Sequence, residues 1–372
     1  MKTILHIIDT TGPGGAETVF IDLATRLPKE KYRAVIVIPG KGWVYDELCY
    51  RGFTPVLLEA KGSFNWRYLL ALRKIIKSER VDLIQSHLLG SNVYCALAGL
   101  LTRKPVVTIF HGAVDVSETE SFMALKFALI NKGASRIVAV SENLGDEIAG
   151  RTPLNSNKME VIYNGIDSAA FERKKSDDFR QQFAWGENDF IVGSLGNIRP
   201  AKAYDVLLQA AALLKNQTQT CRFVIAGQGE SKGKLSHLYK ELLNLRELLG
   251  LQDHVKFIGF VDDPADFLSK IDLFLLSSSS EGFSISTIQA MASSLPVIAT
   301  RSGGPEEIVT HQEDGWLVEK DNPAAIAEAI SILSENPESC EMLSGNAKQK
   351  VDSRFGLAAM LAAYQVLYSK LL

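Results

Sequence analysis

The chain has 372 residues, of which 46% are hydrophobic and 22% are charged, and its formal net charge at pH 7 is −3. This length is typical of two domains with cores of ordinary size. The near balance of charge argues against a nucleic-acid partner or a disordered charged tail, and no apolar run approaches the roughly 20 residues of a membrane span.

The four cysteines lie far apart in the sequence and show no CxxC spacing. That pattern favours neither zinc binding nor a disulfide framework, so buried free thiols are expected. The opening residues become polar too soon for a secretion signal. Together these features predict a reducing, cytoplasmic location.

Short apolar runs alternate with helical patterns along the first half of the chain. Strands are predicted at residues 4–8, 34–38, 55–58, 83–85, 106–110 and 137–140. The first helix is predicted at 16–27. Such alternation is typical of parallel strands joined by helical crossovers.

The same alternation resumes in the second half. Its strands are predicted at residues 191–195, 223–226, 255–258, 273–276 and 297–299. The polar segment 168–189 is interpreted as the linker region. The chain is therefore predicted to form two doubly wound, Rossmann-like parallel-sheet domains that face a cleft, one over residues 1–170 and the other over 171–354. The last helix, 355–372, is expected to pack back on the first domain.

Glycine-rich loops follow strands in both halves. Gly14 and Gly15 end such a loop after the first strand, where a backbone without side chains could approach a ligand closely. The pattern GPGGAE is neither a dinucleotide fingerprint nor a P-loop, and a plain strand-to-helix turn is the alternative. Gly303, Gly304 and Glu307 form a similar loop after the strand predicted at 297–299.

Arg199 and Lys202 lie three residues apart, just before a helix predicted to begin near Tyr204. The free N–H groups of a helix start favour anions such as phosphates. Two cations at this place can neutralise a diphosphate group. Taken alone, the two residues could also be a solvated basic pair.

An acidic segment stands at the end of one buried strand. The strand predicted at 273–276 and a run of serines are followed by Glu281, Gly282, Phe283 and Ser284. The next helix is predicted at 283–293 and includes Gln289. In open α/β sheets this edge is where ligands bind. A glutamate that only interacts with the helix start is the plainer interpretation, and Gln289 could be a tolerated surface amide.

Two histidines also stand at strand ends. His111 follows the strand predicted at 106–110, and His87 follows the one predicted at 83–85. A lone histidine is more often structural than functional. Their place at the carboxyl ends of strands nevertheless makes both His111 and His87 candidates for a functional site.

These segments resemble the GT-B glycosyltransferases of the large retaining family 4, which use nucleotide sugars. The matches, in chain order, are Gly14-Gly15-Ala16-Glu17, His111-Gly112, residues 161–167, Arg199 with Lys202, Glu281, and Gly303-Gly304-Pro305-Glu306-Glu307. Any one match is weak, but six in the right order make the resemblance specific. It covers nearly the whole chain.

Two positions depart from the family pattern. Gln289 stands where the family has the second glutamate of its two-glutamate motif, and Ala203 stands where it usually has glycine. The family glutamate accepts hydrogen bonds from both ribose hydroxyls of the nucleotide, whereas an amide offers one acceptor oxygen and two donor hydrogens. The departure at Gln289 therefore bears on nucleotide recognition, and a donor lacking one ribose hydroxyl is a conceivable partner.

The resemblance implies a retaining glycosyltransferase that moves a sugar from a nucleotide diphosphate sugar to a hydroxyl acceptor. The acceptor would be a glycan, a lipid-linked molecule or a small molecule, in cell-surface polysaccharide or glycoconjugate synthesis. Catalytic roles fall to His111, Glu281, Arg199 and Lys202. Donor binding falls to Arg199, Lys202, Glu281, Gly282, Phe283, Ser284, Gln289, Gly303, Gly304 and Glu307, and an acceptor or phosphate loop to Gly14 and Gly15. The paired cations would take the place of a metal, so no metal and no cofactor are expected.

Three other functions compete with this interpretation: a nucleotide-sugar epimerase on the same fold, a phosphorylase or sugar-phosphate synthase, and a catalytically silent binding subunit. An epimerase would be expected to carry more acid/base candidates in the first domain than His111 and His87. The helix 65–80 is basic and amphipathic and could contact an anionic membrane peripherally, on the inner face. A solvated basic face of an ordinary helix is the alternative.

Overall fold

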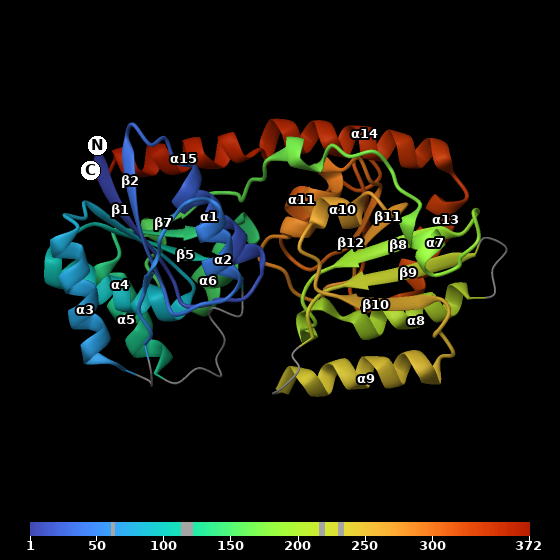
Figure 1. The fold of residues 1–372 in the computed structure, drawn as a ribbon, viewed down its shortest axis with the longest axis horizontal. Coiled ribbons are helices and arrows are strands. Elements are labelled where there is room, and N and C mark those ends of the chain that lie inside the picture. Colours follow the sequence, from blue (N-terminus) through green and yellow to red (C-terminus); the bar gives the residue numbers. More distant parts are fainter. Residues whose placement is uncertain (61–63, 113–121, 216–219, 230–233) are drawn as a thin grey trace. The chain divides into compact units, whose positions relative to one another are not determined.

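The computed structural model describes residues 1–60, 64–112, 122–215, 220–229 and 234–372. The chain divides into two compact units. Residues Met1–Gly165 and Ala358–Leu372 form the first unit, and Ile166–Leu357 form the second. Each unit has a parallel sheet with helices packed against it (Figure 1).

The first unit contains a seven-stranded sheet in the order β3-β2-β1-β4-β5-β6-β7. Its strands are β1 (Lys2–Ile8), β2 (Tyr32–Ile38), β3 (Val56–Leu57), β4 (Leu83–His87), β5 (Val106–Phe110), β6 (Arg136–Ala139) and β7 (Met159–Val161). Sequence reasoning missed β7, because this short edge strand is only partly buried and carries a charged residue in its middle.

Helices cover both faces of this sheet. They are α1 (Gly15–Arg26), α2 (Trp43–Tyr50), α3 (Trp66–Ser78), α4 (Leu89–Thr102), α5 (Met123–Gly133), α6 (Glu142–Arg151) and the last helix, α15 (Leu357–Ser369). Because side chains alternate across a strand, Leu5 and Ile7 of β1 pack with α3 and α4. Ile8 faces the other way and packs with α1 and α2.

The helix α15 ends the chain on the first unit. Tyr364 and Tyr368 are completely buried, and the Tyr368 ring meets the Tyr32 ring edge-on at 5.9 Å. The Gly165 backbone N–H donates to the Met360 sulfur at 3.2 Å. These apolar side chains therefore form the face of α15 that packs within the first unit.

The second unit contains a six-stranded sheet in the order β10-β9-β8-β11-β12-β13. Its strands are β8 (Phe190–Leu195), β9 (Cys221–Ala226), β10 (Val255–Gly259), β11 (Leu273–Leu276), β12 (Val297–Thr300) and β13 (Trp316–Val318). The strand β13 was not predicted. The two doubly wound parallel sheets expected from the sequence are confirmed.

The helices of the second unit are α7 (Asp178–Gln182), α8 (Tyr204–Leu214), α9 (Lys234–Leu248), α10 (Pro264–Leu268), α11 (Ile285–Ala292), α12 (Pro305–Ile308), α13 (Pro323–Ser334) and α14 (Pro337–Arg354). Three of them begin with an Asp or Asn cap followed by proline: Asp263-Pro264, Asn322-Pro323 and Asn336-Pro337. The cap accepts a hydrogen bond from the first turn, and proline has no N–H to leave unsatisfied there.

All four cysteines are free thiols. Cys95 and Cys221 are buried, as expected. Cys340 is only half-buried, and the expectation of burial is wrong for Cys49, which is exposed on α2. In the described part of the chain, no helix combines the length and apolar character that crossing a bilayer requires.

Candidate functional site

The strand order of the second unit reverses between β8 and β11. At such a reversal the connecting loops leave toward opposite faces, which opens a crevice at the carboxyl ends of the strands. Lys202 lies beyond the end of β8, and Glu281 lies beyond the end of β11. The reversal thus brings together two of the residues that the sequence singled out, 79 positions apart.

Lys202 and Glu281 form an ion pair across this point. The Lys202 Nζ lies 2.6 Å from the Glu281 Oε1, and the side chains are 20% and 13% exposed. The hydroxyl of Ser278 donates to the same carboxylate oxygen at 2.6 Å. The hydroxyl of Ser277 donates to the Lys202 carbonyl at 2.8 Å. The run of serines that precedes Glu281 therefore ties the two loops together.

Glycine and tyrosine shape the space around Lys202. A Cβ atom on Gly196 would lie 2.8 Å from the Lys202 Cε, so glycine leaves the path of the lysine side chain open. The buried hydroxyl of Tyr204 donates to the Gly196 carbonyl at 2.7 Å and holds the turn after β8 in place. Tyr204 was named from the sequence only as a helix start, so its hydrogen bond is a finding of the structure.

Ala203 adopts a left-handed backbone conformation, with φ of 46° and ψ of 48°. This conformation costs a residue with a Cβ atom roughly 1–2 kcal/mol but costs glycine almost nothing. Glycine, which the family usually has at this position, would therefore adopt the observed backbone conformation at a lower cost.

Arg199 is exposed and lies directly before the short 3₁₀ turn Pro200–Lys202. Among the described residues no ion pair to Arg199 is found, so the structure joins Lys202, but not Arg199, to Glu281. The helix α8 starts two residues after Lys202. Its first turn adds a partial positive charge near the lysine.

The loop at Gly303 and Gly304 packs tightly against the Glu281 loop. The Glu281 backbone N–H donates to the Ser302 carbonyl at 2.8 Å, and the Gly304 N–H donates to the Glu281 carbonyl at 2.9 Å. A Cβ atom on Gly304 would lie 2.6 Å from the Gly282 carbonyl oxygen. Gly303 has a φ of 112°, which L residues rarely adopt. The paired glycines thus permit a close approach of two backbones.

Glu306, which sequence reasoning passed over, stabilises this loop. Its Oε2 accepts hydrogen bonds from the backbone N–H groups of Ser302 at 3.1 Å and Gly303 at 2.9 Å. Burial raises the pKa of its carboxyl, although these N–H groups favour the ionised form. The candidate Glu307 lies on the same short helix, α12, and is partly exposed.

The other candidates of the acidic segment lie at the start of helix α11 or within it. Ser284 caps it by accepting a hydrogen bond from the Thr287 backbone N–H at 3.3 Å. Phe283 is buried, with its ring 5.6 Å from that of Phe355. Gln289 lies on α11 and is 8% exposed, and within the described residues its side-chain amide has no hydrogen-bond partner.

In the first unit, His87 and His111 come together at the carboxyl ends of β4 and β5. The His87 Nδ1 lies 2.9 Å from the His111 Nε2, and the two rings are stacked with centroids 5.1 Å apart. Burial lowers the pKa of His111 to about 3 and lowers the pKa of His87 well below its usual value. Both rings are therefore neutral at neutral pH.

Gly14 and Gly15 lie at the start of α1, with Glu17 folded back on them. The Thr10 hydroxyl donates to the Glu17 Oε1 at 2.6 Å, and a Cβ atom on Gly14 would lie 2.3 Å from the Glu17 Oε2. The glycine at position 14 therefore makes room for a glutamate of the same segment. This packing supports the plainer interpretation of that position as a strand-to-helix turn.

Asp9 is a further polar residue at this edge, and it was not singled out from the sequence. Its Oδ2 accepts a hydrogen bond from the Ser91 backbone N–H at 2.9 Å. The contact spans the reversal between β1 and β4. Its position directly after the first strand was the available signal, because ligands bind where parallel strands end.

No three side chains of His, Cys, Asp or Glu gather to hold a metal ion in the part of the chain that the structure describes. The absence of a metal and of a cofactor therefore stays a prediction from the sequence.

Two doubly wound sheets with polar loops at their reversals have the architecture of the GT-B fold, and the comparisons with known proteins agree. Residues 13–170 match the model of Glycosyltransferase Family 4, and residues 175–350 match that of Glycosyl transferases group 1. The Bacillus subtilis protein EpsD, a glycosyltransferase by name, is 33% identical over 80% of this chain and 79% of its own length. The chain belongs to this glycosyltransferase family.

Other relatives match along the full length. The N-acetyl-alpha-D-glucosaminyl L-malate synthase of Bacillus anthracis is 25% identical over 99% of this chain and 97% of its own. Among solved structures, Anabaena Alr3699/HepE in complex with UDP-glucose has a TM-score of 0.89 at 25% identity and covers 100% of both chains. The GT-B fold expected from the sequence is confirmed.

Acidification is expected to destabilise the first unit through its buried histidines. Burial lowers the pKa of His6 to about 3 from an ordinary value of 6.5, and lowers that of His87 as well. The stability that these neutral rings contribute is present above pH 6.5 and is lost as the pH falls toward the folded-state pKa. Between about pH 6 and pH 4, the His6 ring should lower the free energy of unfolding by about 1.4 kcal/mol per pH unit, and His87 should act in the same direction.

Urea denaturation at a series of pH values measures this slope. The His6→Gln variant should lose the contribution of one ring. The exposed His237, with a side chain 79% accessible, provides the control, since His237→Gln should leave the slope unchanged. Equal slopes in His6→Gln and the wild type would contradict the assignment.

Proposed function

We propose that this glycosyltransferase moves a sugar from a nucleoside diphosphate sugar to a hydroxyl acceptor and retains the configuration at the anomeric carbon. The observation that carries the proposal is the Lys202–Glu281 pair at 2.6 Å, which stands at the strand reversal where ligands of such sheets bind. The Anabaena relative was crystallised with UDP-glucose, which makes UDP-glucose the first donor to test.

In this proposal the donor diphosphate lies at the start of α8, against Lys202 and Arg199. When the bond between the anomeric carbon and the phosphate oxygen breaks, negative charge develops on the departing diphosphate. The two cations and the partial positive charge of the helix start stabilise that charge. The ion pair with Glu281 holds the lysine in place before the donor arrives, so little reorganisation is needed.

The acceptor hydroxyl oxygen forms its bond to the anomeric carbon on the face that the diphosphate leaves, and its proton passes to a departing phosphate oxygen. This front-face route is what the family resemblance implies. Glu281 would contact hydroxyls of the donor sugar and stabilise positive charge at the anomeric centre. His111, on the acceptor side, would bind a sugar or acceptor oxygen near the reacting atoms.

Loss of either member of the charged pair should abolish most of the transfer. Lys202→Ala removes a cation that stabilises the leaving group, and Glu281→Ala removes the carboxylate near the sugar. Each should lower kcat/KM by about 100-fold or more. The assay follows sugar transfer from the donor that gives the largest thermal shift in a screen of nucleotide sugars, since a specific ligand raises the melting temperature.

Lys240→Ala, on the exposed face of α9, is the matched control and should keep full activity. Donor incubated without acceptor, followed by sugar analysis, tests the epimerase alternative. An epimerised donor, or transfer that survives both substitutions in folded protein, would contradict the proposal. No transfer with any donor, together with donor binding, would favour the silent binding subunit.

Gln289 is expected to limit the affinity for the nucleotide. A ribose hydroxyl that faces an amide in place of a carboxylate is less well paired, at a cost of roughly 1–3 kcal/mol in a dry site. Gln289→Glu should therefore keep or improve the Kd for the donor nucleotide, by up to about tenfold. Titration calorimetry measures this, with the exposed Gln252→Glu as a control of equal charge. Weaker binding in Gln289→Glu would contradict the role given to this residue.

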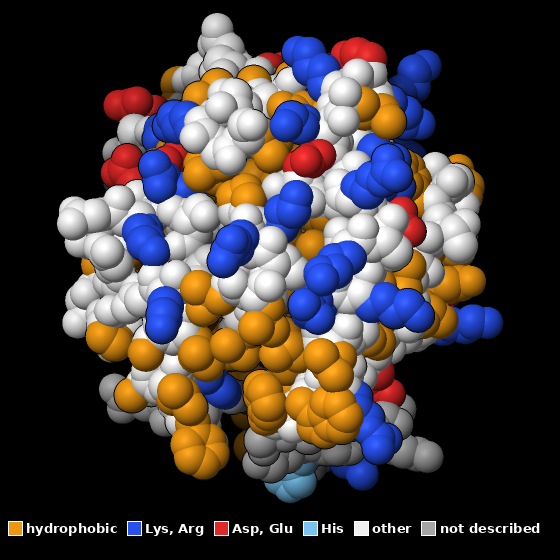
Figure 2. All heavy atoms as spheres, turned by 90° about the vertical axis from the view of Figure 1, so that its left-hand side faces the viewer, with side chains coloured by type: hydrophobic (Ala, Val, Ile, Leu, Met, Phe, Trp, Pro, Cys, Tyr) orange, Lys and Arg blue, Asp and Glu red, His pale blue; other side chains and the backbone are white. Residues whose placement is uncertain are grey.

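The first unit also carries a surface suited to peripheral contact with an anionic membrane on the cytoplasmic side. Tyr68, Leu72 and Ile76 of α3 face the core. The exposed residues on this helix include Trp66, Leu70, Arg67, Lys74 and Lys77. Figure 2 shows Lys and Arg side chains spread across one face, with a band of hydrophobic side chains below them. Basic charge and exposed apolar side chains are the two attractions that hold a helix at an anionic lipid surface.

Charge reversal on α3 should weaken binding to lipid. Lys74→Glu with Lys77→Glu should reduce association with vesicles of equal parts phosphatidylglycerol and phosphatidylcholine by about tenfold or more. Sedimentation with vesicles measures the association. The same change at Lys240 and Lys256 of the second unit is the control. Equal binding to pure phosphatidylcholine, or no effect of the α3 substitutions, would contradict the membrane surface.

A further inference from the structure

A line of polar side chains runs through the interior of the first sheet. Parallel strands covered on both faces are usually apolar throughout, yet β1 and β4 place His6, Gln85 and His87 on one face with no solvent exposure. The register pairs His6 directly with Gln85. Buried polar groups are costly unless they are hydrogen-bonded, so the contacts of these side chains show what the line does.

Gln85 is the centre of the line. Its Nε2 lies 3.4 Å from the His6 Nδ1 and 3.1 Å from the His87 Nε2. Its Oε1 accepts a hydrogen bond from the hydroxyl of Tyr368 on α15, 283 residues further along the chain. The His87 Nδ1 then meets the His111 Nε2 at 2.9 Å. A continuous chain thus leads from the last helix to the candidate catalytic histidine, within one unit.

With the Gln85 oxygen facing the Tyr368 hydroxyl, the protons of this chain can be assigned one after another. Because the hydroxyl donates to the Gln85 oxygen, the amide nitrogen faces the histidine rings as the donor. The His87 Nε2 must then accept, so the proton of His87 is on Nδ1 and is donated to the His111 Nε2. The His111 Nε2 is therefore the acceptor, and its own proton is on Nδ1.

We propose that Tyr368 and Gln85 are positioning residues that hold His111 in its Nδ1–H tautomer, so that His111 acts on the reaction as a hydrogen-bond donor and not as a base. The proposal rests on the role of His111 in the proposed function. It agrees with the proposed front-face route, in which the acceptor proton passes to the departing phosphate, because in this assignment the His111 Nε2 lone pair accepts from His87. The ligand group that His111 recognises is then an oxygen of the sugar or the acceptor.

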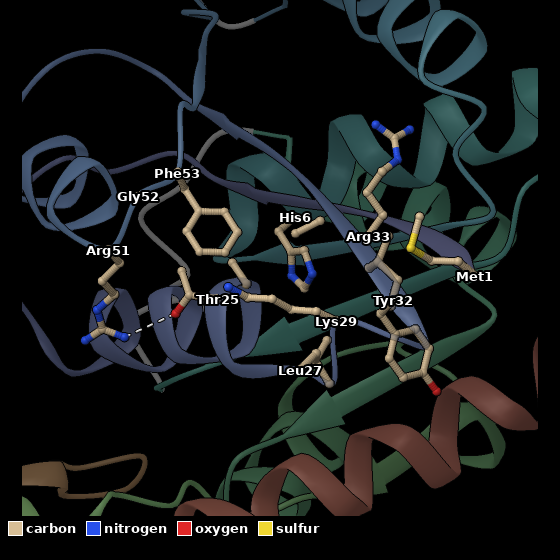
Figure 3. Close-up of a pocket in the computed structure, with 13 residues that line it drawn as sticks. Met1, His6, Thr25, Leu27, Lys29, Tyr32, Arg33, Arg51, Gly52 and Phe53 are labelled. Atoms are coloured by element: carbon tan, nitrogen blue, oxygen red, sulfur yellow. Dashed lines mark hydrogen bonds between the residues drawn. The ribbon is translucent and has the colours of Figure 1, made fainter.

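The other branch, at His6, does not anchor the chain. With its Nδ1 accepting from Gln85, His6 carries its proton on Nε2, and that buried atom has no hydrogen-bond partner among the described residues. His6 lines a cavity of about 300 Å³, where Figure 3 shows its ring among Thr25, Tyr32 and Phe53. The contact that orients the amide in this proposal is the hydrogen bond from Tyr368.

Nitrogen-15 NMR of the histidine rings tests the assignment without an activity assay, since each tautomer has its own pattern of ring nitrogen shifts. In the wild type, His87 and His111 should both be in the Nδ1–H form. Tyr368→Phe removes the hydroxyl that orients the amide, so both rings should lose this single tautomer. Gln85→Glu places only acceptor oxygens at the centre and should reverse both rings to the Nε2–H form.

Tyr364→Phe is the matched control. Tyr364 lies one turn earlier on α15 and is equally buried, but its hydroxyl has no partner among the described residues. Its removal should leave every histidine signal in place. An Nε2–H form of His111 in the wild type, unchanged tautomers in Tyr368→Phe, or an equal change in Tyr364→Phe would overturn the proposal.

Kinetics separate this proposal from the proposed function. If His111 donates a hydrogen bond near the reacting atoms, Tyr368→Phe should lower kcat about threefold to tenfold and leave the KM for the donor unchanged, while Tyr364→Phe behaves as the wild type. A tautomer change with an unchanged kcat would support the hydrogen-bonded chain and contradict the role given to His111. A lower kcat without a tautomer change would overturn the chain.

Discussion

The candidate residues of each unit depend on one constraint, the reversal of strand order within a parallel sheet. Right-handed crossovers carry the chain to opposite faces on the two sides of a reversal, so the carboxyl-end loops separate there. In the second unit this places Lys202 opposite Glu281. In the first unit it places Asp9 opposite the start of α4. Residues distant in sequence meet because of where their strands lie.

Glycine is what lets the loops meet at these points. Gly196 leaves room for the side chain of Lys202, Gly304 for the backbone of Gly282, and Gly14 for the carboxylate of Glu17. A motif glycine is readily attributed to ligand approach, but at these three positions its nearest neighbour is another part of the protein. At position 203 the reason to favour glycine is different. Ala203 has a left-handed backbone conformation, which costs alanine more free energy than glycine.

The two units treat buried polarity in different ways. In the second unit, Lys202 and Glu281 pair opposite charges that keep partial contact with water. The first unit uses neutral rings and an amide, with pKa values of the histidines lowered by burial. A neutral chain avoids the desolvation cost of buried charge, and it transmits orientation through hydrogen bonds.

The sequence by itself determined the class of fold, because alternating apolar runs and helical patterns are local properties that survive without any knowledge of contacts. It also pointed to Lys202, Glu281 and His111, since polar residues at the ends of buried strands are visible as a pattern. It did not reveal β7 and β13, because each strand is only three residues long and too short to show a pattern.

Only the tertiary structure decided which of these residues meet. The contact between Lys202 and Glu281 joins the ends of two neighbouring strands, and strand order is absent from the linear pattern. The link from Tyr368 to Gln85 spans 283 residues. This link forms because the last helix packs on the sheet that contains the first strand. No local feature of Tyr368 or Gln85 shows that the two residues meet.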